Sequence, residues 1–141
     1  MENRISWNGQ MSFTGITPSG HEIKMDAAPE SGGTNSGPRP TELLLNAAAG
    51  CTAIDIISIL QKMRLNPDSL QVVIDGERAR EYPQVFTSIH IHYVLEGELP
   101  EEKVARAIKL SKETYCSVSN SLNASVTATY EINGRQGNKE I

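Results

Sequence analysis

Two cysteines are all that this sequence of 141 residues contains, and they are Cys51 and Cys116. No apolar signal core follows Met1, and no uninterrupted run reaches the ~18 apolar residues that span a bilayer. We therefore expect a cytoplasmic protein without a membrane partner. Because the cytosol keeps thiols reduced, a structural disulfide is not expected, and any disulfide between the two cysteines should be transient.

The chain also lacks an excess of basic residues. It has 13 Lys and Arg against 17 Asp and Glu, and its net charge is −4. Binding to a phosphate backbone needs a basic face, so no nucleic-acid partner is expected. The Gly- and Pro-rich segment 29–40 lacks the Gly-Lys-Ser/Thr ending of a phosphate-binding loop.

Hydrophobic periodicity predicts three strands, a long helix, two strands, a second helix and a last strand. The expected ranges are Ile5–Trp7, Met11–Ile16, His21–Met25, 40–65, Leu70–Ile74, Val85–Leu95, a helix from Pro100, and Ala124–Ile132. Helices and strands do not alternate strictly, so the predicted class is α+β with mostly antiparallel sheets. The length fits one domain, residues 1–141, and the polar end, 134–141, is expected to fray.

Apolar side chains cover nearly the whole circumference of the long helix in its first turns. A helix of this kind is typically buried on all sides, and one chain with short sheets covers it poorly. The hydrophobic fraction of 38% is also somewhat low. We therefore expect an intertwined homodimer. Gly50 costs about 1 kcal/mol relative to Ala inside a helix, which suggests close packing beside Cys51.

From the residues alone, the cysteines have two interpretations. Free cysteines are often buried and pack as small, inert hydrophobes. If the fold brings the pair together, one thiolate can attack a peroxide, become a sulfenic acid and condense with the second thiol. The sequence near Cys51 provides no cation to lower the pKa of its thiol, and Asp55, one helical turn away, would tend to raise it.

His90 and His92 lie two positions apart on a predicted strand, as metal-binding pairs can. A metal would need a third ligand, and His21 is the only other histidine. A solvated sheet face is the simpler interpretation, so no metal site is expected.

Three segments carry a family resemblance. Residues 40–55 read PTELLLNAAAGCTAID, residues 76–87 read GERAREYPQVFT, and residues 115–122 read YCSVSNSL. In this order they resemble the first cysteine motif, the intervening hairpin and the second cysteine motif of the OsmC/Ohr family, and of its YhfA-type subgroup in particular. The resemblance implies mostly antiparallel sheets wrapped around long central helices in an interlocked homodimer, with the sites at the subunit interface.

The same resemblance implies thiol-dependent reduction of organic hydroperoxides, with Cys51 as the peroxidatic and Cys116 as the resolving cysteine. The electron donor would be an external dithiol or a lipoyl-bearing protein, and no bound cofactor is implied. Peroxidase members carry a glutamate at the position of Thr41, and Glu42 is the candidate to replace it. They also carry an arginine that holds the thiolate; the candidates for that contact or for substrate binding are Arg39, Arg78 and Arg80.

Two alternatives remain open at this point. The first is a dimer of the same fold that binds a small molecule or senses redox state without turnover. The second is a structural dimer whose thiols are inert.

Overall fold

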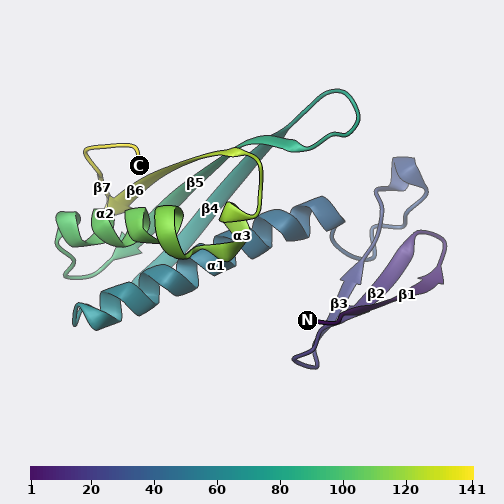
Figure 1. The fold of residues 1–141 in the computed structure, drawn as a ribbon, viewed down its shortest axis with the longest axis horizontal. Coiled ribbons are helices and arrows are strands. Elements are labelled where there is room, and N and C mark those ends of the chain that lie inside the picture. Colours follow the sequence, from purple (N-terminus) through teal and green to yellow (C-terminus); the bar gives the residue numbers. More distant parts are fainter. The chain divides into compact units, whose positions relative to one another are not determined.

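A computed structural model describes residues 1–141 as two compact units, Met1–Leu44 and Leu45–Ile141. The strands are β1 (Arg4–Gly9), β2 (Ser12–Ile16), β3 (Glu22–Met25), β4 (Ser69–Arg78), β5 (Phe86–Glu96), β6 (Ser125–Ile132) and β7 (Arg135–Gln136). The helices are a 3-10 turn (Pro29–Ser31), α1 (Pro40–Lys62), α2 (Glu101–Leu110), a π-helical turn (Ser111–Tyr115) and α3 (Ser117–Asn120) (Figure 1). The predicted elements therefore all form, in the predicted order.

The first unit is built on a three-stranded antiparallel sheet in the order β1–β2–β3. Only Gly15 and Asp26 are buried in it. The Asp26 carboxylate accepts hydrogen bonds from the backbone N–H groups of Ala27, Thr34 and Ser36 and from the hydroxyls of Thr34 and Ser36. These bonds, that of the Ser36 N–H first, hold the pKa of Asp26 well below its ordinary value. Hydrogen bonds to the Asp26 carboxylate thus hold the segment after β3 in place, and the unit has no apolar core of its own.

The second unit has a four-stranded sheet in the order β4–β5–β6–β7. The β5–β6 pair is parallel and the other two pairs are antiparallel, so the predicted α+β class with mostly antiparallel pairing is confirmed. Helices α1 and α2 cover one face of this sheet (Figure 1). The core between them consists of Ile56, Leu60, Ile89, Ile91, Tyr93, Leu95, Leu99, Val104, Ala107, Ile108, Ala128, Tyr130 and Ile132.

Helix α1 ends three residues earlier than predicted. Arg64 adopts a left-handed φ of 60°, and the N–H of Leu65 donates to the carbonyl of Leu60 at 2.8 Å. This is a Schellman-type termination, which satisfies a carbonyl at the helix end before Pro67 is reached.

As the sequence predicts, the single chain covers α1 poorly, and burial on all sides by a second copy stays a prediction. The buried residues of α1 form one stripe at four-residue spacing: Ala48, Thr52, Ile56 and Leu60. Ile54 is 72% exposed, and a Cβ added at Gly50 would meet nothing within 4 Å, so the close packing expected at this glycine is absent from the chain.

Helix α1 is also long and apolar enough to cross a membrane by length and mean hydropathy, although polar residues interrupt it. This is weak support for a membrane span, because core helices of soluble proteins pass the same test. In this chain Thr52, on the same helix, bonds to Tyr93 of the sheet, which makes α1 a core helix of the second unit.

The C-terminal end has backbone partners where the sequence predicts fraying. Strand β7 pairs with β6, and Ile141 and Ala128 exchange two backbone hydrogen bonds of 2.7 and 2.8 Å. The polar composition of residues 134–141 does not predict this pairing. Backbone N–H and C=O groups form hydrogen bonds whatever side chains they carry.

Candidate active site

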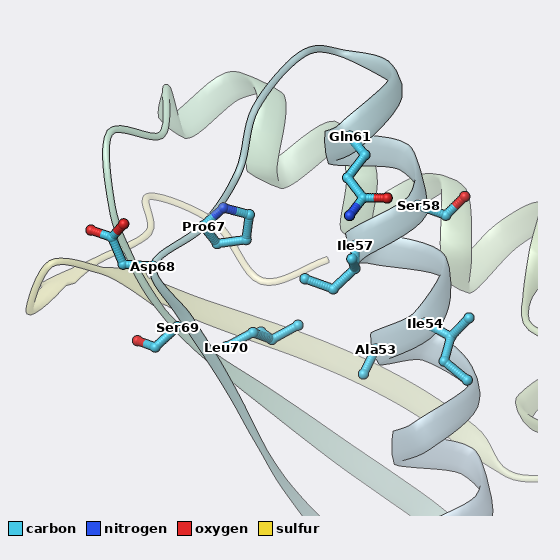
Figure 2. A pocket seen from close by; sticks show the side chains of 9 residues that line it. All are labelled: Ala53, Ile54, Ile57, Ser58, Gln61, Pro67, Asp68, Ser69 and Leu70. Atoms are coloured by element: carbon cyan, nitrogen blue, oxygen red, sulfur yellow. The ribbon is translucent and has the colours of Figure 1, made fainter.

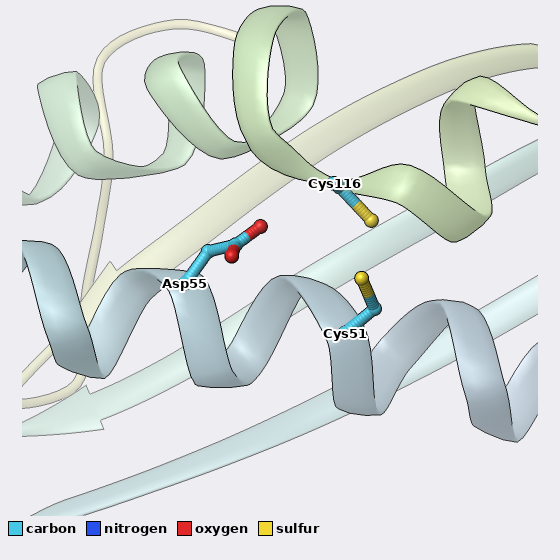
Figure 3. Close-up of side chains that lie close together, drawn as sticks. All are labelled: Cys51, Asp55 and Cys116. Carbon is cyan, nitrogen blue, oxygen red and sulfur yellow. The ribbon is translucent and has the colours of Figure 1, made fainter.

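The two cysteines face each other within the second unit. Cys51 projects from α1, and Cys116 lies between the π-helical turn and α3 (Figure 3). Both are free thiols, and their sulfur atoms and a carboxylate oxygen of Asp55 all lie within 4.8 Å of one another. Residues far apart in the sequence are thus brought close enough for thiol chemistry between them.

The π-helical turn accounts for the inward orientation of Cys116. Its N–H donates to the Ser111 carbonyl five residues back, at 2.8 Å, which widens the last turn after α2. The extra residue in a π-helical turn changes the direction in which the following side chains point, relative to a continuous α-helix. Such turns are frequent at functional sites. Tyr115, at a position that continues the buried stripe of α2, is 56% exposed, and Cys116 is 1% exposed.

The two thiols differ in environment. Cys51 is half-buried, and Cys116 is almost completely buried. Burial raises the pKa of the Cys116 thiol, and the neighbouring Cys51 sulfur raises it further, against the effect of the Ser119 N–H that points at the Cys116 sulfur from 3.5 Å. Cys116 is therefore held as a protonated thiol at neutral pH.

A buried chain of hydrogen bonds supports the third member of the cluster. Ser111 Oγ donates to Asp55 Oδ2 at 2.9 Å and lies 2.8 Å from Thr52 Oγ1, which in turn lies 2.7 Å from the Tyr93 hydroxyl. The partner of Asp55 that the sequence did not name is thus Ser111. A signal for it was present: Thr52 and Ser111 are hydroxyls at core positions of two helices, where a polar group needs a partner.

The surroundings of Asp55 are open on one side. A cavity of about 300 Å³ is lined by Asp55 together with Ser58 and with apolar, aromatic and basic side chains: Ile59, Lys62, Met63, Arg106, Leu110 and Tyr115. Small molecules can therefore approach the carboxylate from solvent.

A second cavity, of about 630 Å³, lies along an adjoining face of α1, and Ser58 lines both cavities (Figure 2). It is shallow and runs between the helix and the segment that leads into β4. Its lining is mostly apolar on the helix side: Ala53, Ile54, Ile57, Ser58, Gln61, Pro67, Asp68, Ser69 and Leu70. It contains neither cysteine.

Residues 33–131 match the family described as OsmC-like protein. The chain belongs to the OsmC-like family. It is 42% identical to Protein YhfA of Escherichia coli K12 over 138 residues, which cover 94% of this chain and 98% of that protein. The resemblance found in the three motifs is thereby confirmed.

Solved structures place this OsmC-like chain in the same fold family. A hypothetical protein from Aquifex aeolicus superposes with a TM-score of 0.78 at 29% identity, over 93% of this chain and 94% of that chain. An organic hydroperoxide resistance protein from Elizabethkingia anophelis superposes with a TM-score of 0.68 at 16% identity, over 93% and 94%. The second likeness supports the fold alone.

The candidate charged residues of this OsmC-like protein have other partners. Glu42 Oε1 accepts the backbone N–H of Arg39 at 2.8 Å, which caps the start of α1. The Arg39 guanidinium donates to Asn35 Oδ1 and the Gly37 carbonyl. Both residues lie in the first unit, and their catalytic or binding roles stay predictions.

Arg78 and Arg80 lie at the end of the β4–β5 hairpin. Arg78 Nε donates to the Gln84 carbonyl at 2.8 Å, and the Gln84 amide donates to the Arg80 carbonyl at 3.2 Å. These bonds shape the hairpin end, and contact of either guanidinium with a thiol or a substrate stays a prediction.

His90 and His92 lie on a polar sheet face. The ring nitrogens of His90 bond to the hydroxyls of Thr127 and Thr129, and those of His92 bond to Thr129 and the Glu131 carboxylate. Both rings are therefore engaged in a cross-strand ladder between β5 and β6.

Proposed function

We propose that this OsmC-like protein reduces organic hydroperoxides through Cys51 and Cys116. The observation that carries the proposal is the meeting of two free thiols within 4.8 Å on a fold shared with organic hydroperoxide resistance proteins. A disulfide bond is about 2.05 Å long, so the two sulfur atoms have to approach each other further to form one.

The environments favour Cys51 as the first nucleophile. It is the more accessible thiol, whereas burial keeps Cys116 protonated. The Cys51 thiolate attacks the terminal peroxide oxygen and the O–O bond breaks, which gives a sulfenic acid on Cys51 and an alkoxide. The alkoxide takes up the proton that the Cys51 thiol released and leaves as the alcohol. Cys116 then attacks that sulfur and water leaves, so the pair becomes a disulfide.

Asp55 has a role in the second step. Cys116 must lose its proton to attack, and the Asp55 carboxylate is part of the same cluster. We infer that Asp55 accepts this proton and passes it to the leaving hydroxide, which departs as water, while Ser111 holds the carboxylate in place. An external dithiol, of the lipoyl type or similar, then reduces the disulfide in the cytoplasm, and no bound cofactor takes part.

The test is peroxide consumption with cumene hydroperoxide and a dithiol reductant. Cys51→Ser should abolish turnover, and Cys116→Ser should allow one oxidation but block recycling through the disulfide. In the wild type, intact-mass spectrometry should detect the loss of two hydrogen atoms after peroxide treatment. Equal, slow consumption by the wild type and Cys51→Ser would rule the proposal out.

A redox sensor without turnover is the second candidate. It is favoured by Thr41 at the family's glutamate position and by the hydrogen bonds that already occupy Arg39 and Arg78. A sensor would form the disulfide with one equivalent of peroxide but would consume no more when dithiol is in excess. Steady-state consumption beyond one equivalent per chain therefore separates the two.

We also propose that the working form is a homodimer. The first unit exposes Trp7 (67%), Ile5 (58%) and Phe13 (38%), and the open side of α1 exposes Ile54. Apolar surface of this extent on two elements is typical of protein–protein interfaces. Trp7 is the only tryptophan, so its emission should shift to the red when the protein is diluted. Light scattering that gives a monomer at all concentrations would contradict the proposal.

A further inference from the structure

We propose that the reduced cluster of Cys51, Cys116 and Asp55 binds a thiophilic divalent cation, with Zn²⁺ as the type. Two sulfur atoms and a carboxylate oxygen converge within 4.8 Å from α1 and from the turn before α3 (Figure 3). The sequence predicts no metal site, because the only candidate ligands it suggests are the histidines, which lack a third partner. The fold instead brings Cys116 to Cys51 and Asp55, which lie one helical turn apart on α1.

The donor set selects the class of metal. Thiolate sulfur is a ligand for Zn²⁺ and related soft cations, whereas Mg²⁺ and Ca²⁺ take oxygen ligands. In a tetrahedral site with Zn–S bonds near 2.3 Å and Zn–O bonds near 2.0–2.2 Å, neighbouring ligand atoms are roughly 3.5–3.8 Å apart. The ligand atoms, which lie within 4.8 Å of one another, therefore need to approach by at most about 1.3 Å.

Two neighbouring hydrogen-bond donors, of Ser111 and Ser119, hold these ligands in place. Ser111 Oγ donates to Asp55 Oδ2, which leaves the other carboxylate oxygen free of that bond, and the Ser119 N–H points at the Cys116 sulfur. Outer partners of this kind orient metal ligands. The cavity of about 300 Å³ beside Asp55 opens this carboxylate to solvent, and neither cysteine lines it.

Three protein ligands leave a fourth tetrahedral position for water or a small molecule. On binding, both thiols release their protons, so each bound Zn²⁺ displaces two H⁺. The sulfur lone pairs that bind the metal are then unavailable to attack peroxide. Metal binding and disulfide formation therefore exclude each other, although the metal site itself does not depend on peroxidase activity.

The experiment uses the reduced full-length protein without peroxide. We expect one Zn²⁺ per chain, measured by competition with a chromogenic chelator, and a sulfur-to-cobalt charge-transfer band when Co²⁺ replaces Zn²⁺. Protein oxidised to the disulfide should bind neither ion at this site. Asp55→Asn should weaken binding at least tenfold, because even an outer-shell partner typically contributes 10–100-fold.

The matched control is Asp75→Asn, which removes an exposed carboxylate from β4 and should leave the affinity unchanged. Cys51→Ser and Cys116→Ser should each abolish the cobalt band, with circular dichroism to confirm folding. A wild-type cobalt complex without that band, or equal affinities for Asp55→Asn and Asp75→Asn, would overturn the site. Neither result bears on peroxide turnover, which is measured separately.

Discussion

Two faces of α1 have similar composition and opposite environments. The face toward the sheet carries the buried stripe of Ala48, Thr52, Ile56 and Leu60. The opposite face carries exposed Ala47, Gly50 and Ile54, followed by Ser58 and Gln61 at the same helical spacing. Residues of similar hydrophobicity are thus fully buried on one side of the helix and largely exposed on the other.

A helix that is apolar on all sides needs a separate covering element for each of its two faces. The sheet of its own unit covers one face, and this face also holds the polar chain from Tyr93 through Thr52 to Asp55. The other face is largely exposed in the second unit, where only the segment that leads into β4 borders it. If a second copy covers it, residues on the two faces respond differently to mutation and to protein concentration.

The largest effect is expected on the buried face. Leu60→Ala should lower the free energy of unfolding by about 2–5 kcal/mol, because Leu60 is fully buried and its removal leaves a cavity. Ile54→Ala on the same helix, at low protein concentration, should cost no more than about 0.5 kcal/mol. Urea denaturation of both variants measures this, and equal losses would remove the distinction between the faces.

A charged side chain on the exposed face of α1 should weaken dimer formation. Ile54→Lys should weaken self-association at least tenfold, because burying an unpaired ammonium at an interface costs several kcal/mol. The control is Val73→Lys, at a residue that is 53% exposed on β4. Analytical ultracentrifugation of the two variants compares them. A dimer that forms as readily in the Ile54→Lys variant as in the wild type would move the interface away from this face.

The sequence predicted the elements and the family well, and it predicted the site only in part. Strand and helix periodicity located every main element, since alternation and capping are local properties. The approach of Cys51 to Cys116 could not be derived locally, because it depends on the π-helical turn that rotates Cys116 inward. Thr52 and Ser111 are recognisable as hydroxyls at core positions, but the sequence does not indicate which distant group each one faces, so their contact was not predicted.

Breaking one hydrogen bond in the polar chain on the buried face should lower the free energy of unfolding moderately. Tyr93→Phe removes one hydrogen bond to Thr52, which keeps its contact with Ser111, so the expected loss is about 1 kcal/mol. Circular dichroism with chemical denaturation measures it. Unchanged stability at pH 7 would mean that this bond contributes nothing to holding α1 on the sheet.

The same variant should change the alkaline response. Burial raises the pKa of Tyr93 from 10.0 to about 12, so the unfolded chain ionises first and stability falls as the pH rises from 10 toward 12. Tyr93→Phe should make this fall shallower without abolishing it, because the pKa of Tyr130 is also raised to about 12. An identical alkaline profile in both proteins would contradict burial of the Tyr93 hydroxyl.

The smallest effect is expected for Gly50→Ala. Whether this substitution stabilises the protein or weakens the dimer tests whether the exposed face of α1 stays open. A Cβ at Gly50 meets nothing within 4 Å in the single chain, so Gly50→Ala should stabilise α1 by up to about 1 kcal/mol if this face stays open. If a partner helix packs closely against Gly50, the same methyl group obstructs the contact, and dissociation should occur at higher protein concentration. Thermal unfolding measured at two protein concentrations distinguishes the cases. Stabilisation at both, with no change in association, would place the dimer contact elsewhere on the chain.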